Sequence, residues 1–245
     1  MAVFLLLSGE GASDIGDQHE IGLMTKFIDH WVIRRSNYSL IEIKCYKIVS
    51  KTELADIAKS QLKPLSKKGK KHKKETGYFY QNARALALLA KELAKELAKE
   101  ESSKLETIVI PVLFRDADGT ASSDRGEWQD KYQSVLNGFE AEAILNGVPM
   151  IPKPKSEAWI LCALRERYHN CQPLENESGN DDSPKSLKKQ LEQHLGKPAT
   201  RELLNDEIDQ GNLDISNIID MPSLTAFKER LDEVLDNLRL PRQDY

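Results

Sequence analysis

The stretch "TIVIPVLFRDADG" (residues 107–119) joins a continuous apolar run to two aspartates. Such a run is typical of a strand that is covered on both faces of a parallel sheet. Asp116 and Asp118 follow at i and i+2, a spacing that points side chains the same way along an extended chain. Two carboxylates held side by side repel each other unless a cation lies between them. The stretch therefore predicts a parallel sheet with a cation site at the end of one strand.

Similar patterns predict the other elements of the chain. Three further strands are expected at residues 2–8, 40–48 and 148–152. After the turn "SGEGAS", a helix is expected whose inner side carries Ile15, Leu23, Phe27 and Trp31. More helices are expected at 52–62, 78–104, 156–168 (with Ser156 as its N-cap), 184–195, 199–210 and 223–238. Strands that alternate with helices, followed by helices alone, predict an α/β fold with a mostly parallel sheet and a helical C-terminal part.

The composition changes after Tyr168, which suggests how the chain is divided. We expect an α/β domain over residues 1–168, a polar linker or loop over 169–184, and a helical extension over 185–245.

Charge and cysteine content exclude several classes of protein. The net charge is −4, so any nucleic-acid binding must come from a local patch. The three cysteines are widely spaced and form no CxxC pair, which argues against a disulfide framework and a cysteine-based zinc site. The apolar start "MAVFLLLSGE" lacks a basic segment and is too short for a signal peptide or membrane span. We therefore expect a cytoplasmic protein without a membrane partner.

Acidic residues recur where the predicted strands end. Glu10 follows the first strand and Asp14 comes one helical turn later, while Glu157 opens the helix after the fourth strand. Functional residues of open parallel sheets gather beyond the carboxyl ends of the strands. With Asp116 and Asp118 these residues form an all-oxygen set without His or Cys, which favours Mg²⁺ or Mn²⁺. Such ions stabilise the attacking and leaving oxygens in phosphoryl transfer.

The motifs "LLLSGEGASD" and "VLFRDADG" resemble those of TOPRIM domains, in which a glutamate follows the first strand and a DxD follows a later one. "EGASD" is similar to the corresponding stretch of OLD-type nucleases. "KPKSEAWILCAL" and "IIDMPSLTAFKERL" resemble small bacterial TOPRIM-like proteins that are often paired with ABC-type ATPases in phage defence. The resemblance covers most of the chain in order and implies a TOPRIM-like (Rossmann-like) fold.

The resemblance also implies roles for individual residues. Glu10 would act as acid–base or metal-binding residue, and Asp116 and Asp118 as metal ligands. Asp14 and Glu157 would complete a second ion site, and Lys155, or its neighbour Lys153, would offset charge on the phosphate. The sequence departs from the ExEAW pattern of the group, because Lys155-Ser156-Glu157 keeps only one acid.

"FRDADGT" also fits the DxDGT signature of haloacid-dehalogenase-like phosphatases. In that alternative Asp116 is the nucleophile, and Asp181 and Asp182 would be the further acids such a site requires. The alternative does not explain Glu10 or the "SGEG" turn.

Lysines are concentrated in "KPLSKKGKKHKKETG" (residues 63–77). Lysines bind phosphate backbones without sequence preference, and an acidic site needs local positive charge to approach DNA or RNA. The residues expected to contact nucleic acid are Lys67, Lys68, Lys70, Lys71, Lys73 and Lys74. A solvated loop without such a role is the simpler alternative.

Together these observations lead to a functional expectation. We expect a Mg²⁺- or Mn²⁺-dependent enzyme, a nuclease or effector subunit that hydrolyses nucleic-acid phosphodiesters. By the resemblance, it would act in antiviral defence with an ABC- or OLD-type ATPase as partner. The alternatives are the phosphatase and a non-catalytic regulatory subunit that keeps the fold with a weakened site.

Overall fold

Four parallel strands form the centre of the molecule. The computed structural model describes residues 2–17, 19–62, 77–99, 107–118, 127–164 and 170–238. The strands pair in the order β2-β1-β3-β4, and their bounds are β1 (Ala2–Ser8), β2 (Tyr46–Val49), β3 (Thr107–Phe114) and β4 (Val148–Met150). The two long apolar runs, β1 and β3, lie side by side, with Ala2 opposite Thr107 and Ser8 opposite Leu113. A mixed α/β fold with a parallel sheet is thus confirmed, and it is consistent with a Rossmann-like architecture.

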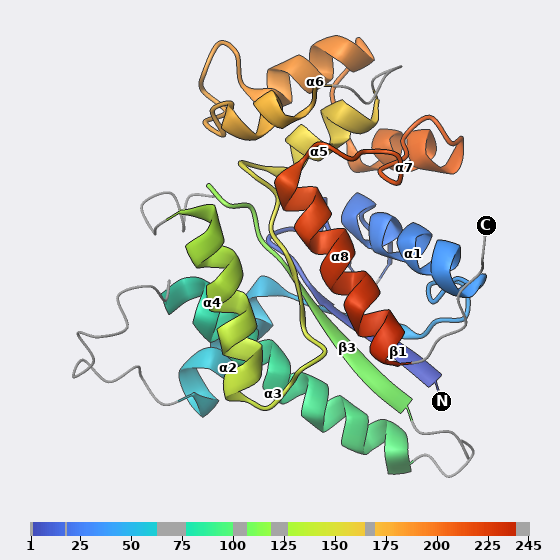
Figure 1. Ribbon diagram of the computed structural model, residues 1–245, viewed down its shortest axis with the longest axis vertical. Helices are drawn as coiled ribbons and strands as arrows, with labels where there is room; N and C mark the ends of the chain where they lie inside the picture. The colour runs from blue at the N-terminus through green and yellow to red at the C-terminus, as the bar shows by residue number, and fades with distance from the viewer. Residues whose placement is uncertain are drawn as a thin grey trace.

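Helices cover both faces of this sheet (Figure 1). One face is covered by α2 (Lys51–Gln61), α3 (Gly77–Lys99) and α4 (Trp128–Ala141), and the other by α1 (Leu23–Ser36) and α8 (Pro222–Asn237). On the first face Leu6 and Leu113 pack in one cluster with Phe79 of α3. On the second face Leu7 packs in a cluster that includes Phe227 of α8. Because successive strand residues point to opposite faces, each central strand contributes to both clusters.

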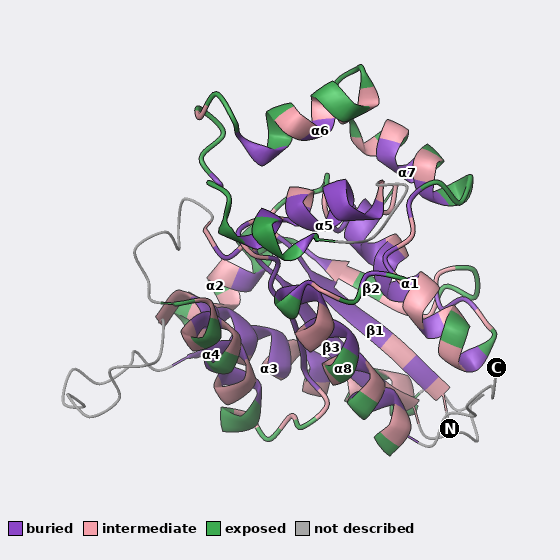
Figure 2. Cartoon of the chain, turned by 45° about the horizontal axis from the view of Figure 1, so that its top comes forward, coloured by how far each residue is buried: buried purple, intermediate pink, exposed green. Residues whose placement is uncertain are grey.

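The remaining helices lie beyond the carboxyl ends of the strands (Figure 1). They are α5 (Ser156–Ala163), the short 3₁₀ helix η1 (Gln172–Asn176), α6 (Leu187–Leu195) and α7 (Arg201–Asp209). Leu191 of α6 and Leu204 of α7 belong to the same hydrophobic cluster as Trp159 and Phe227. Figure 2 shows the central strands buried, whereas α6 and α7 expose much of their surface. The helical C-terminal part therefore shares its core with the sheet.

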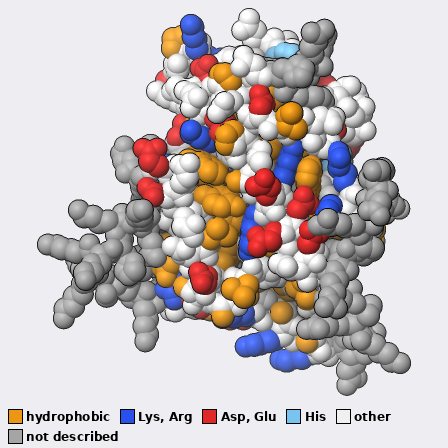
Figure 3. Space-filling model, viewed as in Figure 1, with side chains coloured by type: hydrophobic (Ala, Val, Ile, Leu, Met, Phe, Trp, Pro, Cys, Tyr) orange, Lys and Arg blue, Asp and Glu red, His pale blue; other side chains and the backbone are white. Residues whose placement is uncertain are grey.

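Polar contacts join α8 to α1 and to the loop before β4. Trp31 Nε1 donates to Asp232 Oδ1 at 2.9 Å, and Arg230 Nε donates to the carbonyl of Gly147 at 3.0 Å. At its outer surface, Arg230 and Glu233 form an ion pair of 2.6 Å, and Figure 3 shows acidic and basic side chains next to each other along this helix. In the described part of the chain, no helix is long and apolar enough to cross a membrane.

The second strand was predicted wrongly at its start. It begins at Tyr46, and not at residue 40, because the preceding main-chain donors bind a side chain. The N–H groups of Leu40 and Ile41 both donate to Asp29 Oδ1, at 2.8 and 3.3 Å. Lys44 then takes a left-handed conformation with φ 57°, which ends any extended run.

Two helix starts also differ from the prediction. The first helix begins at Leu23, so Ile15 lies in the preceding turn, although its side chain is buried in the core. Gly16 has φ 103° and pairs with Ile21, a hairpin-like turn that a helix cannot contain. Ser156 is the first residue of α5 and not its N-cap, which is Lys155.

Candidate functional site

The acidic residues gather where the chain leaves the two central strands. The chain passes from β1 to α1 on one face of the sheet and from β3 to α4 on the other. Neighbouring parallel strands whose connections leave in opposite directions open a crevice at their carboxyl ends. Glu10 follows β1 and Asp116 follows β3, so both lie at this crevice.

Main-chain hydrogen bonds hold the Asp116–Asp118 segment next to the start of α5. The pairing of β3 with β4 continues past both strands, because Ala117 N–H donates to Pro152 O at 3.1 Å and Asp118 N–H to Pro154 O at 3.2 Å. The N–H of Ser156 donates to Asp116 Oδ1 at 3.0 Å. The fold thus brings Asp116 and Ser156, which are forty positions apart, into contact. A shared site at the strand ends requires such a contact.

The pKa of Asp116 is strongly raised in the folded chain. Burial raises its pKa well above the ordinary range, and the charges of Asp14, Glu157 and Glu10 raise it further. The hydrogen bond from Ser156 opposes this shift. Four acidic residues that the sequence places beyond three strand ends therefore act on one another in the folded chain.

Asp14 and Glu157 complete this group. Burial raises the pKa of Asp14 to about 7, with Glu157 and Glu10 adding to the shift. Burial also raises the pKa of Glu157, which lies in the first turn of α5. We call Glu10, Asp14, Asp116 and Glu157 the acidic cluster. Groups of like charge with raised pKa values in a crevice are typical of functional sites.

Asp118 has a different environment from Asp116. Burial raises its pKa, but the charges that act on it are those of Lys155 and Lys131, and the N–H of Gly179 donates to it. Its Oδ1 atom is buried and makes no hydrogen bond within the described residues. The structure therefore brings Asp118 beside the acidic cluster, facing a loop and two lysines.

Lys155 lies between these two environments. Its Nζ is 2.9 Å from Asp181 Oδ1, and only 16% of its side chain is exposed. Burial lowers the pKa of Lys155, but the hydrogen bond and charge of Asp181, together with Glu157 and Asp116, outweigh burial and raise it. Asp181 belongs to the segment that was expected to be a polar linker or loop, and it lies at the site.

Sequence reasoning missed two buried cations. Arg115 is fully buried, and its guanidinium donates to Phe114 O at 2.6 Å and to Asn82 Oδ1 at 3.0 Å. Burial lowers its pKa, which the charges of Tyr78 and Glu10 oppose. Lys131 of α4 is 4% exposed and donates to the carbonyl of Ala117. The burial of Lys131 could have been predicted from the sequence, because Lys131 lies one helical turn before Val135 on the side of α4 that faces the core.

Two clefts flank the acidic cluster. One of about 360 Å³ is bordered by Glu10, Gly11 and the first residues of α2, including Lys51. The other, of about 210 Å³, is bordered by Asp14, Glu157 and Lys188. Glu10 is therefore reached from one cleft, and Asp14 and Glu157 from the other.

The donor set suits a hard divalent cation. Glu10 Oε1 is buried and has no hydrogen-bond partner within the described residues, so an acceptor is left open toward the site. In the described ranges no three acids of the cluster bring their oxygens within 4.8 Å of one another. Mg²⁺ commonly binds through one or two carboxylates and keeps several waters, so an ion here would contact at most two of these acids directly.

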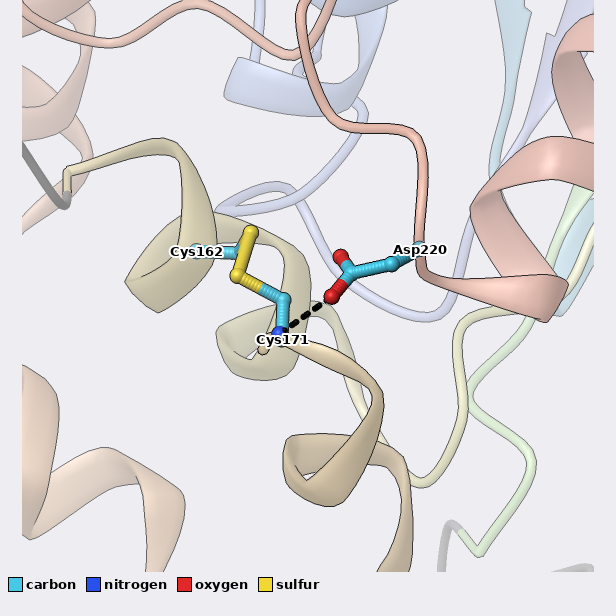
Figure 4. A group of neighbouring side chains, drawn as sticks. All are labelled: Cys162, Cys171 and Asp220. Atoms are coloured by element: carbon cyan, nitrogen blue, oxygen red, sulfur yellow. Dashed lines mark hydrogen bonds between the residues drawn. A yellow bond between two sulfur atoms is a disulfide. The ribbon is translucent and has the colours of Figure 1, made fainter. Parts of the chain in front are cut away.

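The prediction of no disulfide framework was wrong for two of the three cysteines. Cys162 of α5 and Cys171 form a disulfide, and Cys45 is free. Figure 4 shows Asp220 beside this bridge, where its Oδ2 accepts from Cys171 N–H at 2.7 Å. Both sulfurs belong to the covalent bond and are therefore not available as metal ligands in this state. Cys162 and Trp159 are both buried in the core.

The six lysines expected to bind nucleic acid, Lys67, Lys68, Lys70, Lys71, Lys73 and Lys74, lie outside the described residues. Comparisons with protein-family models, with curated proteins and with solved structures find no match to this chain. The case for a function therefore depends on the geometry of the site.

Proposed function

We propose that the protein is a TOPRIM-like nuclease or nuclease effector subunit that uses Mg²⁺ or Mn²⁺ to hydrolyse phosphodiesters in DNA or RNA. The observation that supports this most is the acidic cluster at the crevice between β1 and β3, where burial and mutual repulsion raise the pKa of Asp116 and Asp14. Like charges at such a place are costly to ionise, and a bound divalent cation removes that cost.

The residues divide into holding and positioning roles. The acidic cluster would hold the ion, with one or two of its four carboxylates (Glu10, Asp14, Asp116 and Glu157) binding directly and the others through bound waters. The ion would supply Lewis acidity to the attacking water and the leaving oxygen. Lys155 would offset charge on the phosphate. Lys131 is a positioning residue, because its buried ammonium fixes the carbonyl of Ala117 between the two aspartates. An ATPase partner in antiviral defence, implied by the sequence resemblance, belongs to the same proposal.

Cleavage assays test this proposal directly. Purified protein is incubated with plasmid DNA and with single-stranded RNA, each with Mg²⁺, Mn²⁺ or EDTA. We expect cleavage that requires the cation, and its loss in Glu10→Gln and Asp116→Asn. Asp182→Asn serves as the matched control, because Asp182 is an exposed acid outside the cluster. Equal cleavage by wild type and Asp116→Asn would refute the assignment.

One observation is consistent with the phosphatase alternative. Asp181, from the stretch that this alternative requires near the nucleophile, pairs with Lys155 beside Asp116. A phosphatase would hydrolyse small phosphate esters and form an acyl phosphate on Asp116. Trapping that intermediate with a phosphate mimic, in a protein that leaves nucleic acid uncut, would favour it. Metal binding without either activity, even with an ATPase partner, would favour a regulatory subunit.

A further inference from the structure

Asp220 lies beside the Cys162–Cys171 disulfide and has one carboxylate oxygen without a hydrogen bond (Figure 4). Its Oδ2 accepts from Cys171 N–H at 2.7 Å, which holds the carboxylate next to the bridge. Its Oδ1 is buried and has no hydrogen-bond partner among the described residues. Asp220 directly precedes Met221, the N-cap residue of α8, but no side-chain hydrogen bond caps α8 there. Helix capping therefore does not explain this acid, and a bound ion is one of the partners that explain an open buried acceptor.

The three side chains together form a ligand set for a metal ion that prefers sulfur. The two sulfurs and a carboxylate oxygen of Asp220 lie within 4.8 Å of one another. Zn²⁺ binds cysteine and aspartate side chains, whereas Mg²⁺ and Ca²⁺ prefer oxygen ligands alone.

The sulfurs become metal ligands only after reduction, because a sulfur in a disulfide is not a thiolate. A dithiol supplies two electrons and two protons, so that it becomes a disulfide while Cys162 and Cys171 become thiols. Zn²⁺ then replaces the two thiol protons, which are released to the solvent.

The positions of the two cysteines suit both states. Their Cα atoms are 5.7 Å apart, and both side chains are fully buried. Two Zn–S bonds of about 2.3 Å at a tetrahedral angle place the sulfurs about 3.8 Å apart. This separation is shorter than the Cα–Cα distance, so rotation about the two Cα–Cβ bonds can supply it. Three protein ligands leave the fourth position of a tetrahedral ion to water.

We infer that Cys162, Cys171 and Asp220 form a zinc site when the disulfide is reduced, so that one Zn²⁺ replaces the link that the bridge makes in the oxidised chain. Disulfides are rare in reducing compartments, where this link would otherwise be lost. Cys162 lies in α5 together with Glu157, and Cys171 precedes the segment that brings Asp181 to Lys155. The ion would therefore join that segment to α5 and to the start of α8. The inference does not depend on the proposed nuclease function.

The zinc content of the two redox states tests the inference without an activity assay. The full chain is unfolded and refolded with Zn²⁺, because the site is buried, once with its disulfide and once with a phosphine reductant. A phosphine is used because a dithiol would itself bind Zn²⁺. Excess Mg²⁺ competes for the acidic cluster, which has the same residues in both states. After gel filtration we expect one Zn²⁺ per reduced chain and none per oxidised chain. Co²⁺ in place of Zn²⁺ should give a thiolate-to-cobalt charge-transfer band in the reduced chain alone.

Variants of the three ligands identify the site. Cys162→Ser and Cys171→Ser should lose the ion. Asp220→Asn keeps an acceptor for Cys171 N–H but loses the charged ligand. Its affinity for Zn²⁺, measured against a chromophoric chelator, should fall by more than the roughly 10–100-fold that the loss of an outer-shell partner costs. Cys45→Ser is the matched control and keeps one ion, because Cys45 is free and lies outside this group.

Equal zinc content in the two redox states, a Co²⁺ spectrum without the thiolate band, or an unchanged affinity in Asp220→Asn would overturn the inference. A reduced chain that does not refold even with Zn²⁺, as judged by circular dichroism, would overturn it as well. If a cysteine variant fails to fold, the Co²⁺ spectrum of the wild type and the affinity of Asp220→Asn decide. None of these outcomes bears on the proposed function, which the cleavage assays test separately.

Discussion

Gly179 lies directly against the carboxylate of Asp118. Its N–H donates to that carboxylate, and a Cβ atom at this position would lie 1.6 Å from Asp118 Oδ2. Asp181, two residues later, pairs with Lys155. Residues 177–183, which carry both contacts, therefore form a cover over one side of the site. Position 179 of this cover has no room for a Cβ atom.

Gly179→Ala should push this cover away from Asp118. The three atoms nearest to such a Cβ all belong to the Asp118 carboxylate, which would have to turn away from its present position, because the Asp118 main chain is held by its hydrogen bond to Pro154. We expect the free energy of unfolding in urea to fall by about 1–3 kcal/mol, the range of overpacked buried sites. Gly11→Ala is the control, since its Cβ would meet nothing nearer than Ser13 Oγ at 3.5 Å. Equal stability of the two variants would contradict the contact.

The raised pKa of Asp14 predicts how stability depends on pH in the absence of divalent ions. Its folded-state pKa is about 7, against 3.8 ordinarily, so the folded chain keeps a proton that the unfolded chain loses. The free energy of unfolding should therefore fall as pH rises from about 4 to about 7. Asp116 contributes in the same direction.

Asp14→Asn isolates that contribution. In EDTA at pH 8 the variant should be more stable than the wild type by an amount on the order of a few kcal/mol, and at pH 4 the two should agree. Denaturation at both pH values measures this. Asp206→Asn, on the exposed side of α7, should show no such crossover. A variant that is less stable than the wild type at pH 8 would contradict this prediction, because the ionised Asp14 carboxylate would then stabilise the folded chain.

The fold was predictable where apolar runs are continuous. β1, β3 and β4 begin and end within two residues of their predicted bounds, because both faces of these strands are buried. The second strand was not predictable in detail, since its true start depends on Asp29, a helix residue whose carboxylate captures two main-chain donors. Patterns along the sequence do not show such a tertiary contact.

The site was predictable in the residues that follow strands, and less so elsewhere. Glu10, Asp116 and Glu157 come together because parallel strands end at one edge. Asp181 and Gly179 come from a polar segment that has no periodic pattern, and nothing local shows that it folds back. Arg115 was adjacent to a predicted ligand, yet only the fold shows that it points inward.

The Cys162–Cys171 disulfide should contribute measurably to stability. The two residues are nine positions apart, and closing a loop of that size removes enough unfolded-state entropy to stabilise by about 2–3 kcal/mol. A reductant should lower the free energy of unfolding by that amount. Cys162→Ala/Cys171→Ala should no longer respond to it, whereas Cys45→Ala should respond as the wild type does. Thiol titration of the unreduced, denatured wild type should find one free thiol, and three would contradict the bridge.

Asp181→Asn should strengthen the binding of nucleic acid. In the free protein Asp181 holds the ammonium of Lys155 at 2.9 Å, and a phosphate that uses the same ammonium must displace it. Asp181 is 54% exposed, so its ion pair is partly screened and its loss should change the affinity by about two- to fivefold. Fluorescence anisotropy with labelled single-stranded DNA, in Ca²⁺ to limit cleavage, measures this change. Asp182→Asn removes the same charge one residue away without freeing Lys155, so it separates the ion pair from a general charge effect. Weaker binding by Asp181→Asn than by Asp182→Asn would mean that Asp181 supports the substrate site and does not compete for it.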